Sequence, residues 1–359
     1  MQTPNRPATE GMLAADGTKT HILIVGAGPI GLELAVVLKA MGADYLHLDA
    51  GQVGETVSRY PPATTFFSSP ERIAIAGVPL RPTGEGKATR EQYLTYLHGV
   101  VEQFDLAVQT FAAVQAIERK PQGLSVRTSR GTIVCANLVL AIGDMHHPRR
   151  LEIPGEDLPH VSHFFGEAQR HFRQRVLIVG GKNSAVEAAL RCHRAGARVA
   201  ISYRGRDFDA RSIKYWLLPE IQALIKHGVI GFYPETVLTA IGASAVTLQR
   251  TAGGDAREVE ADAVLLLTGY HQDKSLFESA GVTLEGPNRA PRLDPGTMQT
   301  DVPGLYVAGT AAAGTQNNFE LFIENSHPHV AKIARSITGR DAPAGLINRA
   351  AQTYGLAES

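Results

Sequence analysis

Two glycine-rich turns constrain the fold of this 359-residue chain more than any other feature. The first, Gly26 to Gly31, reads GAGPIG and follows the apolar run 21–25; the second begins at Gly180, 154 positions later, after the apolar run 176–179. Each turn precedes a segment with helical periodicity, so each is predicted to join a buried strand to a helix. Such a turn lets the backbone approach a pyrophosphate, whose charge the helix N-terminus attracts. One turn is weak evidence, but two predict two dinucleotide sites.

The end of the next predicted strand indicates which nucleotide the first turn binds. Asp49 stands 23 residues after Gly26, directly behind the predicted strand 45–48. A carboxylate at this place can accept hydrogen bonds from a ribose diol. The first site therefore suits the adenosine half of FAD.

The corresponding place in the second copy has a different chemistry. Tyr203 stands 23 residues after Gly180, with Arg204 beside it and Arg206 and Arg211 close behind. Guanidinium groups without an acidic residue are typical of a site for a ribose 2′-phosphate. The second nucleotide is therefore predicted to be NADPH, with a solvated surface cluster as the alternative for Arg206 and Arg211.

An internal duplication extends beyond the two turns. Residues 107–143 and 229–269 each predict a β-meander followed by an apolar strand that ends in glycine. We expect an α/β protein with two Rossmann-like, three-layer dinucleotide-binding domains, the NADPH domain inserted into the FAD domain. The expected boundaries give a flexible tail over 1–19, the FAD domain over 20–153 and 271–345, and the NADPH domain over 154–270.

Composition and the remaining motifs narrow the function. Lys plus Arg equals Asp plus Glu at 35 each, which disfavours nucleic acid as a partner. The apolar runs are too short to span a membrane, so we expect a cytoplasmic protein with no membrane partner. Cys135 and Cys192 form no CxxC pair and no metal-spaced set, and we expect both to be buried and no metal to be bound.

Two further segments suit a flavin. The loop 64–70 interleaves hydroxylated and aromatic residues, as expected beside a flat cofactor, although a Pro-rich packing segment would look similar. A helix with Thr89 as N-cap and Gln92 in a capping box is predicted to follow this loop. Near the C-terminus, a short strand ends at Gly309 and a helix follows, whose N-terminus could face the N1–C2=O edge of the flavin.

These features carry a family resemblance that runs from about residue 20 to 340. The glycine turns and the paired strand ends resemble the two-domain flavoproteins of low-molecular-weight thioredoxin reductase type. The stretches YPPATTFFSSPE, PGEDLPHVSHFF, GGKNSAVEAAL, SIKYWLLPE and LTGYH resemble, more closely, the bacillithiol disulfide reductase-like (YpdA) family. This resemblance implies FAD, NADPH, reduction of a low-molecular-weight thiol disulfide in redox homeostasis, and a homo-oligomer.

The predicted cofactor-binding residues lie in the two turns, at the ends of predicted strands and in neighbouring loops. Those of the first copy are Gly26, Gly28, Pro29, Ile30, Gly31, Asp49, Ala50, Tyr60, Phe67, Ser68, Gly143, Gly309, Thr310 and Asn318. Those of the second copy are Gly180, Gly181, Lys182, Asn183, Ser184, Tyr203, Arg204, Arg206, Thr268 and Gly269. The Lys182 side chain is predicted to face a phosphate, with a solvent-exposed surface lysine as the alternative.

The sequence departs from the related families in three places. Residues 163–174 contain no cysteine where thioredoxin reductases carry a CxxC dithiol. Ile30 stands in the first turn where known YpdA-type members have a cysteine, and Thr310 stands where thioredoxin reductases have an aspartate. The residue most often suspected of thiol exchange is therefore absent.

The hypothesis is hydride transfer from NADPH to FAD and electron transfer onward to a small disulfide or another acceptor. An acid must protonate the leaving thiolate, and His271, Glu324 and His327 are the candidates, each of which could also be structural. A ferredoxin- or quinone-directed reductase is the main alternative, because it needs no cysteine. A flavin monooxygenase is a weaker one, since FxGxxxH has only a near match at Phe164. A non-enzymatic redox sensor is the third.

Overall fold

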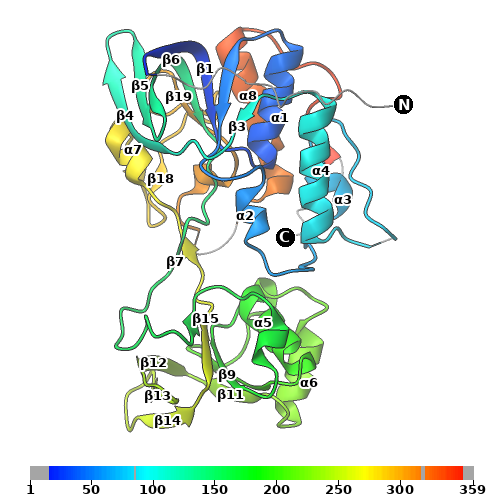
Figure 1. Ribbon diagram of the computed structural model, residues 1–359, viewed down its shortest axis with the longest axis vertical. Coiled ribbons are helices and arrows are strands. Elements are labelled where there is room, and N and C mark those ends of the chain that lie inside the picture. Colours follow the sequence, from blue (N-terminus) through cyan, green and yellow to red (C-terminus); the bar gives the residue numbers. More distant parts are fainter. Residues whose placement is uncertain (1–15, 85, 317–319, 351–359) are drawn as a thin grey trace, which may run out of the picture. The chain divides into compact units, whose positions relative to one another are not determined.

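The computed structural model describes residues 16–84, 86–316 and 320–350, which form two compact units (Figure 1). The first unit holds the described residues up to Arg59, then Ala63–His146 and the residues from His271 on. The second unit holds His147–Tyr270 together with Tyr60–Pro62. One parallel-sheet unit is thus inserted into another, which confirms the predicted α/β fold class.

The first unit is built on a seven-stranded sheet with the order β3-β2-β1-β6-β5-β4, in which β19 also pairs with β6. The five strands β3, β2, β1, β6 and β19 run parallel, whereas β4, β5 and β6 form the predicted antiparallel meander. The strands are β1 (Thr18–Val25), β2 (Tyr45–Leu48), β3 (Val108–Gln109), β4 (Val114–Lys120), β5 (Gly123–Thr128), β6 (Gly131–Leu140) and β19 (Leu305–Val307).

Parallel strands bring their carboxyl ends to one edge of the sheet, and ligands of α/β proteins bind at such an edge. The first glycine turn follows β1, Asp49 follows β2, Gly143 follows β6 and Gly309 follows β19. Residues from four separate parts of the chain are therefore collected at one edge of the first unit.

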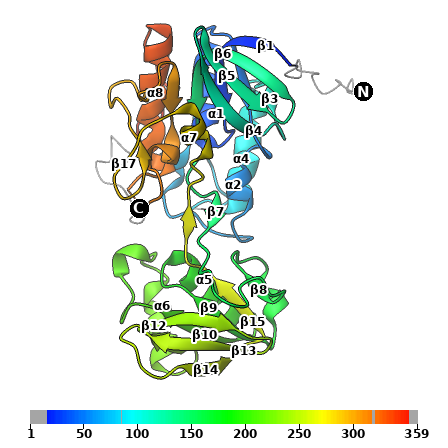
Figure 2. The same ribbon diagram turned by 90° about the vertical axis from the view of Figure 1, so that its left-hand side faces the viewer.

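Helices α1 and α8 lie against one face of this sheet, and α4 lies beside α1 (Figures 1 and 2). The α1 segment from Ile30 to Leu38 is entirely buried, because it lies between the sheet and these helices. The predicted capping box of α4 is confirmed: Gln92 N donates to Thr89 Oγ1, and Gln92 Oε1 accepts from Thr89 N. The helices are α1 (Pro29–Ala40), α2 (Glu55–Ser58), α3 (Pro70–Ile73), α4 (Arg90–Gln103), α7 (Ser275–Ala280), α8 (Ile323–Thr338) and the 3-10 turn η3 (Gly309–Ala313).

The second unit repeats the plan with a parallel sheet of order β11-β10-β9-β15-β8 and a separate antiparallel meander β12-β13-β14. Apolar residues of β9, β10, β15 and α5 form its main core. Its elements are β8 (Val161–Ser162), η1 (Ala168–His171), β9 (Arg175–Val179), α5 (Asn183–Arg194), β10 (Arg198–Tyr203), η2 (Ala210–Ser212), α6 (Leu218–Lys226), β11 (Gly231–Pro234), β12 (Thr236–Ile241), β13 (Ala245–Arg250), β14 (Arg257–Glu260) and β15 (Ala263–Leu266).

Two further pairs of short strands lie outside these sheets. β7 (His147–Pro148) and β16 (Tyr270–His271) pair with each other, at two of the points where the chain passes from one unit to the other. β17 (Leu284–Glu285) and β18 (Ala290–Pro291) form a hairpin in the first unit. The first strand begins at Thr18, one residue before the expected end of the N-terminal tail, whose residues 1–15 lie outside the described residues.

The three glycines of the first turn are suited to their positions for different physical reasons. Gly26 has φ +109°, and a Cβ there would lie 2.3 Å from the Ala141 carbonyl oxygen. A Cβ on Gly31 would lie 1.9 Å from the Gly26 carbonyl oxygen, so helix and strand could not pack as closely. A Cβ on Gly28 would meet no atom within 4 Å. The fold itself thus requires Gly26 and Gly31, whereas Gly28 leaves open space at the N-terminus of α1, where a ligand can approach.

We expect Gly31→Ala and Gly28→Ala to separate folding from binding. Gly31→Ala should lower the free energy of unfolding of the flavin-free protein by about 2 kcal/mol, because the added methyl group overlaps the backbone. Gly28→Ala should leave it within about 0.5 kcal/mol, since its site is open and its backbone extended, but should weaken FAD binding. Urea unfolding and flavin titration measure the two effects, and equal loss of stability in both variants would contradict this reading of the turn.

Candidate functional site

The first glycine turn is held from β2 by two side chains. Asp49 Oδ2 accepts a hydrogen bond from Ala27 N at 2.6 Å, and Oδ1 accepts one from Gly51 N at 2.7 Å. Burial raises the pKa of Asp49. After these two hydrogen bonds, the carboxylate keeps two lone-pair positions that can accept hydrogen bonds from a ligand. Ala50, beside it, is exposed.

His47 was not predicted as a site residue, yet its Nε2 lies 2.9 Å from the Gly26 carbonyl oxygen. Burial lowers the pKa of His47 to about 4, so the ring is neutral and Nε2–H donates to that carbonyl. A polar residue at an inward position of a four-residue strand was the only signal in the sequence. His47 and Asp49 together fix the conformation of the turn that is predicted to bind a pyrophosphate.

A second group of polar residues lies at the carboxyl ends of β6 and β19. Gln272 is only 2% exposed, and its Nε2 donates to Gly143 O at 3.2 Å and to Ala311 O at 2.9 Å. Its Oε1 is buried and receives no hydrogen bond from the described residues. A buried acceptor without a donor is costly, and a ligand hydroxyl would satisfy it. This atom and the open space at Gly28 both fit a bound dinucleotide with a hydroxylated chain, such as FAD.

Thr310 belongs to the same group because its side chain contacts Asp144, a buried residue that follows β6. The Asp144 carboxylate accepts hydrogen bonds from the Thr310 side chain and, at 2.9 Å, from Gln316 Nε2. Burial raises the pKa of Asp144, and these two bonds lower it in part. Gln316 Oε1 accepts from the backbone N–H groups of Glu320 and Leu321, just before α8. The predicted Asn318 lies outside the described residues.

The predicted flavin loop is held by aromatic and basic neighbours. Phe66 packs on Tyr93 with ring centroids 4.6 Å apart. The Lys87 ammonium lies 5.2 Å from the Phe67 ring centroid and donates to the Phe67 carbonyl oxygen. Ser68 is buried. Tyr60, predicted with this loop, belongs to the second unit.

Ile30, which stands where related proteins carry a cysteine, lies in the first turn of α1 and is 5% exposed. A Cβ built on Gly309 would lie 3.5 Å from Ile30 Cβ, so the glycine turn and the end of β19 are in direct contact. Pro29 takes the first helical position, for which its fixed φ is suited. The structure thus brings together the predicted residues that follow β1 and β19.

Two of the three predicted acids, His327 and Glu324, lie inside the first unit on α8. His327 Nδ1 is 2.7 Å from Glu33 Oε2, and Nε2 is 2.9 Å from the Arg72 carbonyl oxygen. Both partners are acceptors, so both ring nitrogens carry hydrogen and the ring is an imidazolium. Glu324 is buried, 3.8 Å from Arg72 Nη1. His271, in β16, is exposed and is not part of this cluster.

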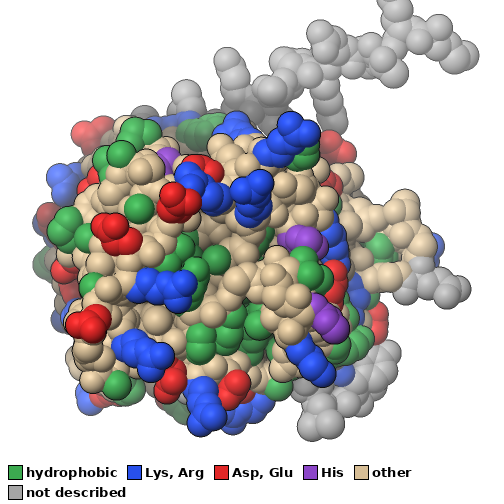
Figure 3. Space-filling view, turned by 90° about the horizontal axis from the view of Figure 1, so that it is seen from below, with side chains coloured by type: hydrophobic (Ala, Val, Ile, Leu, Met, Phe, Trp, Pro, Cys, Tyr) green, Lys and Arg blue, Asp and Glu red, His purple; other side chains and the backbone are tan. Residues whose placement is uncertain are grey.

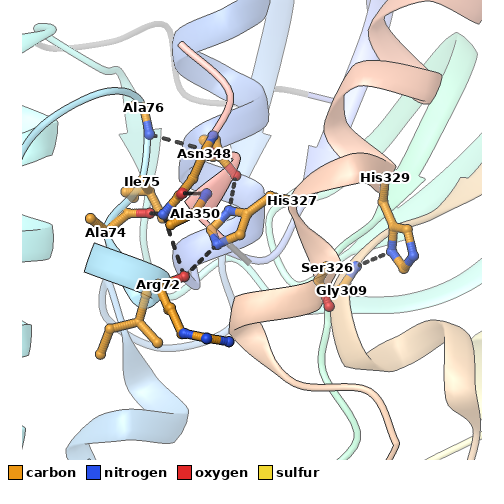
Figure 4. Close-up of polar contacts among 12 residues, drawn as sticks. Arg72, Ala74, Ile75, Ala76, Gly309, Ser326, His327, His329, Asn348 and Ala350 are labelled. Atoms are coloured by element: carbon orange, nitrogen blue, oxygen red, sulfur yellow. Dashed lines mark hydrogen bonds and ion pairs between the residues drawn. The ribbon is translucent and has the colours of Figure 1, made fainter. Parts of the chain in front are cut away.

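Figure 4 shows that the His327 cluster connects α8 to α3 and to the C-terminal segment. Glu33 Oε1 accepts hydrogen bonds from Ala76 N at 3.3 Å and from Asn348 N at 3.0 Å. Burial lowers the pKa of His327, but the Glu33 carboxylate, together with the Arg72 carbonyl and the Glu324 charge, outweighs burial, so the pKa is raised overall. His329, also drawn in Figure 4, accepts from Gly309 N at 3.2 Å, and burial lowers its pKa to about 4.

In the second unit, Tyr203 shapes the nucleotide turn. A Cβ on Gly181 would lie 2.3 Å from the Tyr203 ring, and a Cβ on Gly205 would lie 2.6 Å from it, so the ring fits only between two glycines. The ring also stacks on Phe208, with centroids 5.7 Å apart. Asn183 Oδ1, at the start of α5, accepts from Lys214 N at 2.6 Å.

Basic residues gather around this turn. Burial, and next the charges of Arg149 and Arg204, lower the pKa of Lys182. Arg149 was not predicted; its Nε donates to Tyr270 O at 3.0 Å, and its carbonyl oxygen accepts from Thr268 Oγ1 at 2.8 Å. The run HHPRR at 146–150 was the available signal. Arg206 is exposed and lies 3.9 Å from Asp207. The other predicted residues of this unit lie in the turn or behind β15: Gly180, Ser184 and Gly269.

The two cysteines are unsuited to redox chemistry. Burial raises the pKa of Cys135 to about 12 and that of Cys192 to about 11, so neither is a thiolate near neutral pH. Residues 16–84, 86–316 and 320–350 contain no cluster of His, Cys, Asp and Glu that could hold a metal ion. Within these ranges, no helix is long and apolar enough to cross a membrane. Basic and acidic side chains are interspersed on the face shown in Figure 3.

Two parallel-sheet units, each with a glycine turn in front of a helix, define a class of oxidoreductases that bind a flavin and a pyridine nucleotide. The sequence comparison agrees with this class. Residues 23–309 match the pyridine nucleotide-disulphide oxidoreductase family, and the chain therefore belongs to that family.

Individual relatives are similar over nearly their whole length. Bacilliredoxin reductase Bdr of Bacillus subtilis (strain 168) is 37% identical over 320 residues, which are 89% of this chain and 98% of that protein. Bacillithiol disulfide reductase Bdr (YpdA) of Staphylococcus aureus superposes with a TM-score of 0.85 at 35% identity, covering 90% of this chain and 99% of the other. The Bacillus cereus protein of that name gives 0.85 at 32% identity, with 90% and 100% coverage.

These findings confirm several predictions made from the sequence. The resemblance to the YpdA family and the enzyme class are confirmed, and the chain is an FAD-dependent oxidoreductase that uses NADPH. The individual cofactor-binding and catalytic residues stay predictions.

We expect the Glu33–His327 pair to stabilise the protein in a pH-dependent manner. Because the folded-state pKa of His327 is raised above its ordinary value of 6.5, this stabilisation is complete below that value and is lost as pH rises through the folded pKa. Glu33→Gln should therefore cost about 3 kcal/mol at about pH 6, and the loss should shrink towards about pH 9. Urea unfolding over this range measures it, with exposed Glu71→Gln as the control. A cost that does not change with pH would contradict the charged pair.

The basic residues of the second unit are expected to differ in what they recognise. Arg204→Gln should lower kcat/KM for NADPH about tenfold or more and leave NADH nearly unchanged, as expected for a lost charge-assisted contact with the 2′-phosphate. Arg149→Gln should weaken the binding of NADPH and NADH alike, because Arg149 lies beside the turn rather than behind β10. Arg194→Gln, an exposed arginine of α5, is the matched control. An unchanged NADPH preference in Arg204→Gln would place the 2′-phosphate elsewhere.

Proposed function

We propose that this enzyme uses NADPH to reduce a low-molecular-weight thiol disulfide of the bacillithiol type, without a dithiol of its own. The observation that carries the proposal is the whole-length similarity to proteins named bacillithiol disulfide reductase. We also propose that the first unit binds FAD and the second NADPH, and that the protein acts in the cytoplasm, in redox homeostasis, as a homo-oligomer.

The reduction of the disulfide by NADPH balances in atoms and electrons without a protein thiol. FAD, when bound, accepts a hydride from NADPH and passes two electrons on. Those electrons break the S–S bond of the substrate, and with NADPH and one proton the products are NADP⁺ and two thiols. The described part of the chain offers only Cys135 and Cys192 as thiols, and both are buried and protonated. The disulfide must therefore receive its electrons directly.

The residues of the chain would position the reactants and supply the proton. Ile30 gives an apolar wall beside Gly309 in place of a reactive sulfur. Of the three predicted acids, His327 and Glu324 are held inside the first unit, where they position α8, α3 and α1. His271 is the one that solvent reaches, and we propose it as the proton donor to the leaving thiolate.

The test is an anaerobic two-step reaction with a cysteine-free variant. Cys135→Ala combined with Cys192→Ala should bind FAD as the unchanged protein does. After reduction by NADPH, its flavin should be reoxidised by bacillithiol disulfide at a rate within about twofold of the parent, because neither thiol takes part. Ile30→Cys, which introduces a thiol where the relatives have one, provides the comparison.

Other outcomes assign another function. If the flavin stays reduced with bacillithiol disulfide but is reoxidised by a quinone or a ferredoxin, the disulfide reductase proposal is wrong and the alternative acceptor applies. If only Ile30→Cys reacts with the disulfide, the loss of the cysteine has abolished this activity. If the cysteine-free variant alone fails while the parent reacts, a buried thiol takes part after all.

A further inference from the structure

One buried acceptor in the first unit has no function in the fold. The Gln272 side chain enters the space between Gly143 and Ala311, where its amide nitrogen donates to both carbonyl oxygens. Only an NH₂ group can make these two bonds, so the orientation of the amide is fixed by its neighbours. Its Oε1 is therefore a buried acceptor that no donor of the described residues satisfies.

A carboxylate follows one of the two residues that the Gln272 amide contacts. Asp144 directly follows Gly143, whose carbonyl oxygen receives the Gln272 amide. Its carboxylate accepts hydrogen bonds from the Gln316 amide, the Thr310 side chain and its own backbone N–H, which leaves one further acceptor position on its oxygens. Gln272 and Asp144 thus form a pair of acceptors at the end of β6.

The surroundings of this pair identify the part of the ligand that faces it. A Cβ on Gly143 would lie 3.8 Å from Thr310 Oγ1, and one on Gly309 would lie 3.5 Å from Ile30 at the N-terminus of α1. On the other side, Gln316 holds the backbone just before α8. The pair therefore lies between the turn predicted to bind the pyrophosphate and the helix predicted to face the flavin ring.

The chemistry of the pair excludes a phosphate and favours hydroxyl groups. A carboxylate repels a phosphate, and an amide oxygen can only accept, so the complementary ligand is an uncharged chain of hydrogen-bond donors. We propose that Gln272 Oε1 and the Asp144 carboxylate bind the hydroxyl groups of the ribityl chain of FAD. The proposal rests on the FAD site of the proposed function, and it makes Gln272 and Asp144 cofactor-binding residues that the sequence did not indicate.

The experiment uses FAD analogues that lack single hydroxyl groups of the ribityl chain. Flavin-free protein is titrated with FAD and with the 2′-, 3′- and 4′-deoxyribityl analogues, and flavin fluorescence gives each Kd. At least one analogue should bind roughly threefold to tenfold more weakly than FAD, the effect of one hydrogen bond. This measurement needs no variant, so it does not depend on how a substitution affects folding.

Variants then assign the contact. In Gln272→Leu or Asp144→Asn, the penalty for removing the matching hydroxyl should shrink towards zero, because its partner is gone or has lost its charge. Gln299→Leu and Asp294→Asn make the same substitutions at residues that bond only within the protein, and both should keep the full penalty.

Two results would overturn the inference. In the first, all three deoxy analogues bind the unchanged protein as tightly as FAD. In the second, the penalty persists undiminished in both Gln272→Leu and Asp144→Asn. Neither result affects the proposed function as long as the protein with natural FAD still reduces the disulfide. Conversely, if only the reduction of the disulfide fails, the ribityl contacts still stand.

Discussion

The arrangement of the first unit depends on one buried ion pair between helices that are 294 positions apart in the sequence. Glu33 on α1 and His327 on α8 meet at 2.7 Å, and both side chains are almost completely excluded from solvent. An isolated charge there would be prohibitive, so each group requires the other. The same imidazolium bonds the end of α3, and the same carboxylate bonds the C-terminal segment. The helix behind the glycine turn, the helix behind the flavin loop and α8 are thereby fixed relative to one another.

This pair also shows how far a linear sequence indicates function. His327 and Glu324 were predicted as acids because they stand in the helix expected to face the flavin. Their role as acids stays a prediction, and their partners Glu33 and Arg72 come from distant parts of the chain. Only the three-dimensional structure shows that the polar faces of these side chains are occupied by the protein itself.

The features that could be predicted are those with local causes. The glycine turns are set by steric contacts between neighbours along the strand and helix, and the capping box of α4 by residues three positions apart. Asp49 was found by counting along one βαβ unit. In contrast, His47, Asp144, Gln272 and Arg149 act through contacts that span different strands and turns, and none belongs to a motif with fixed spacing. Such residues become visible only once the strand order is known.

The absence of a reactive cysteine gains meaning from this arrangement. Ile30 lies at the first turn of α1, directly against Gly309, and is buried in the turn predicted to bind the pyrophosphate. A thiol there could exchange with a substrate disulfide, and isoleucine removes that option. On the proposed function, the substrate must itself approach the flavin, and specificity for that substrate has to come from non-covalent contacts rather than from thiol exchange.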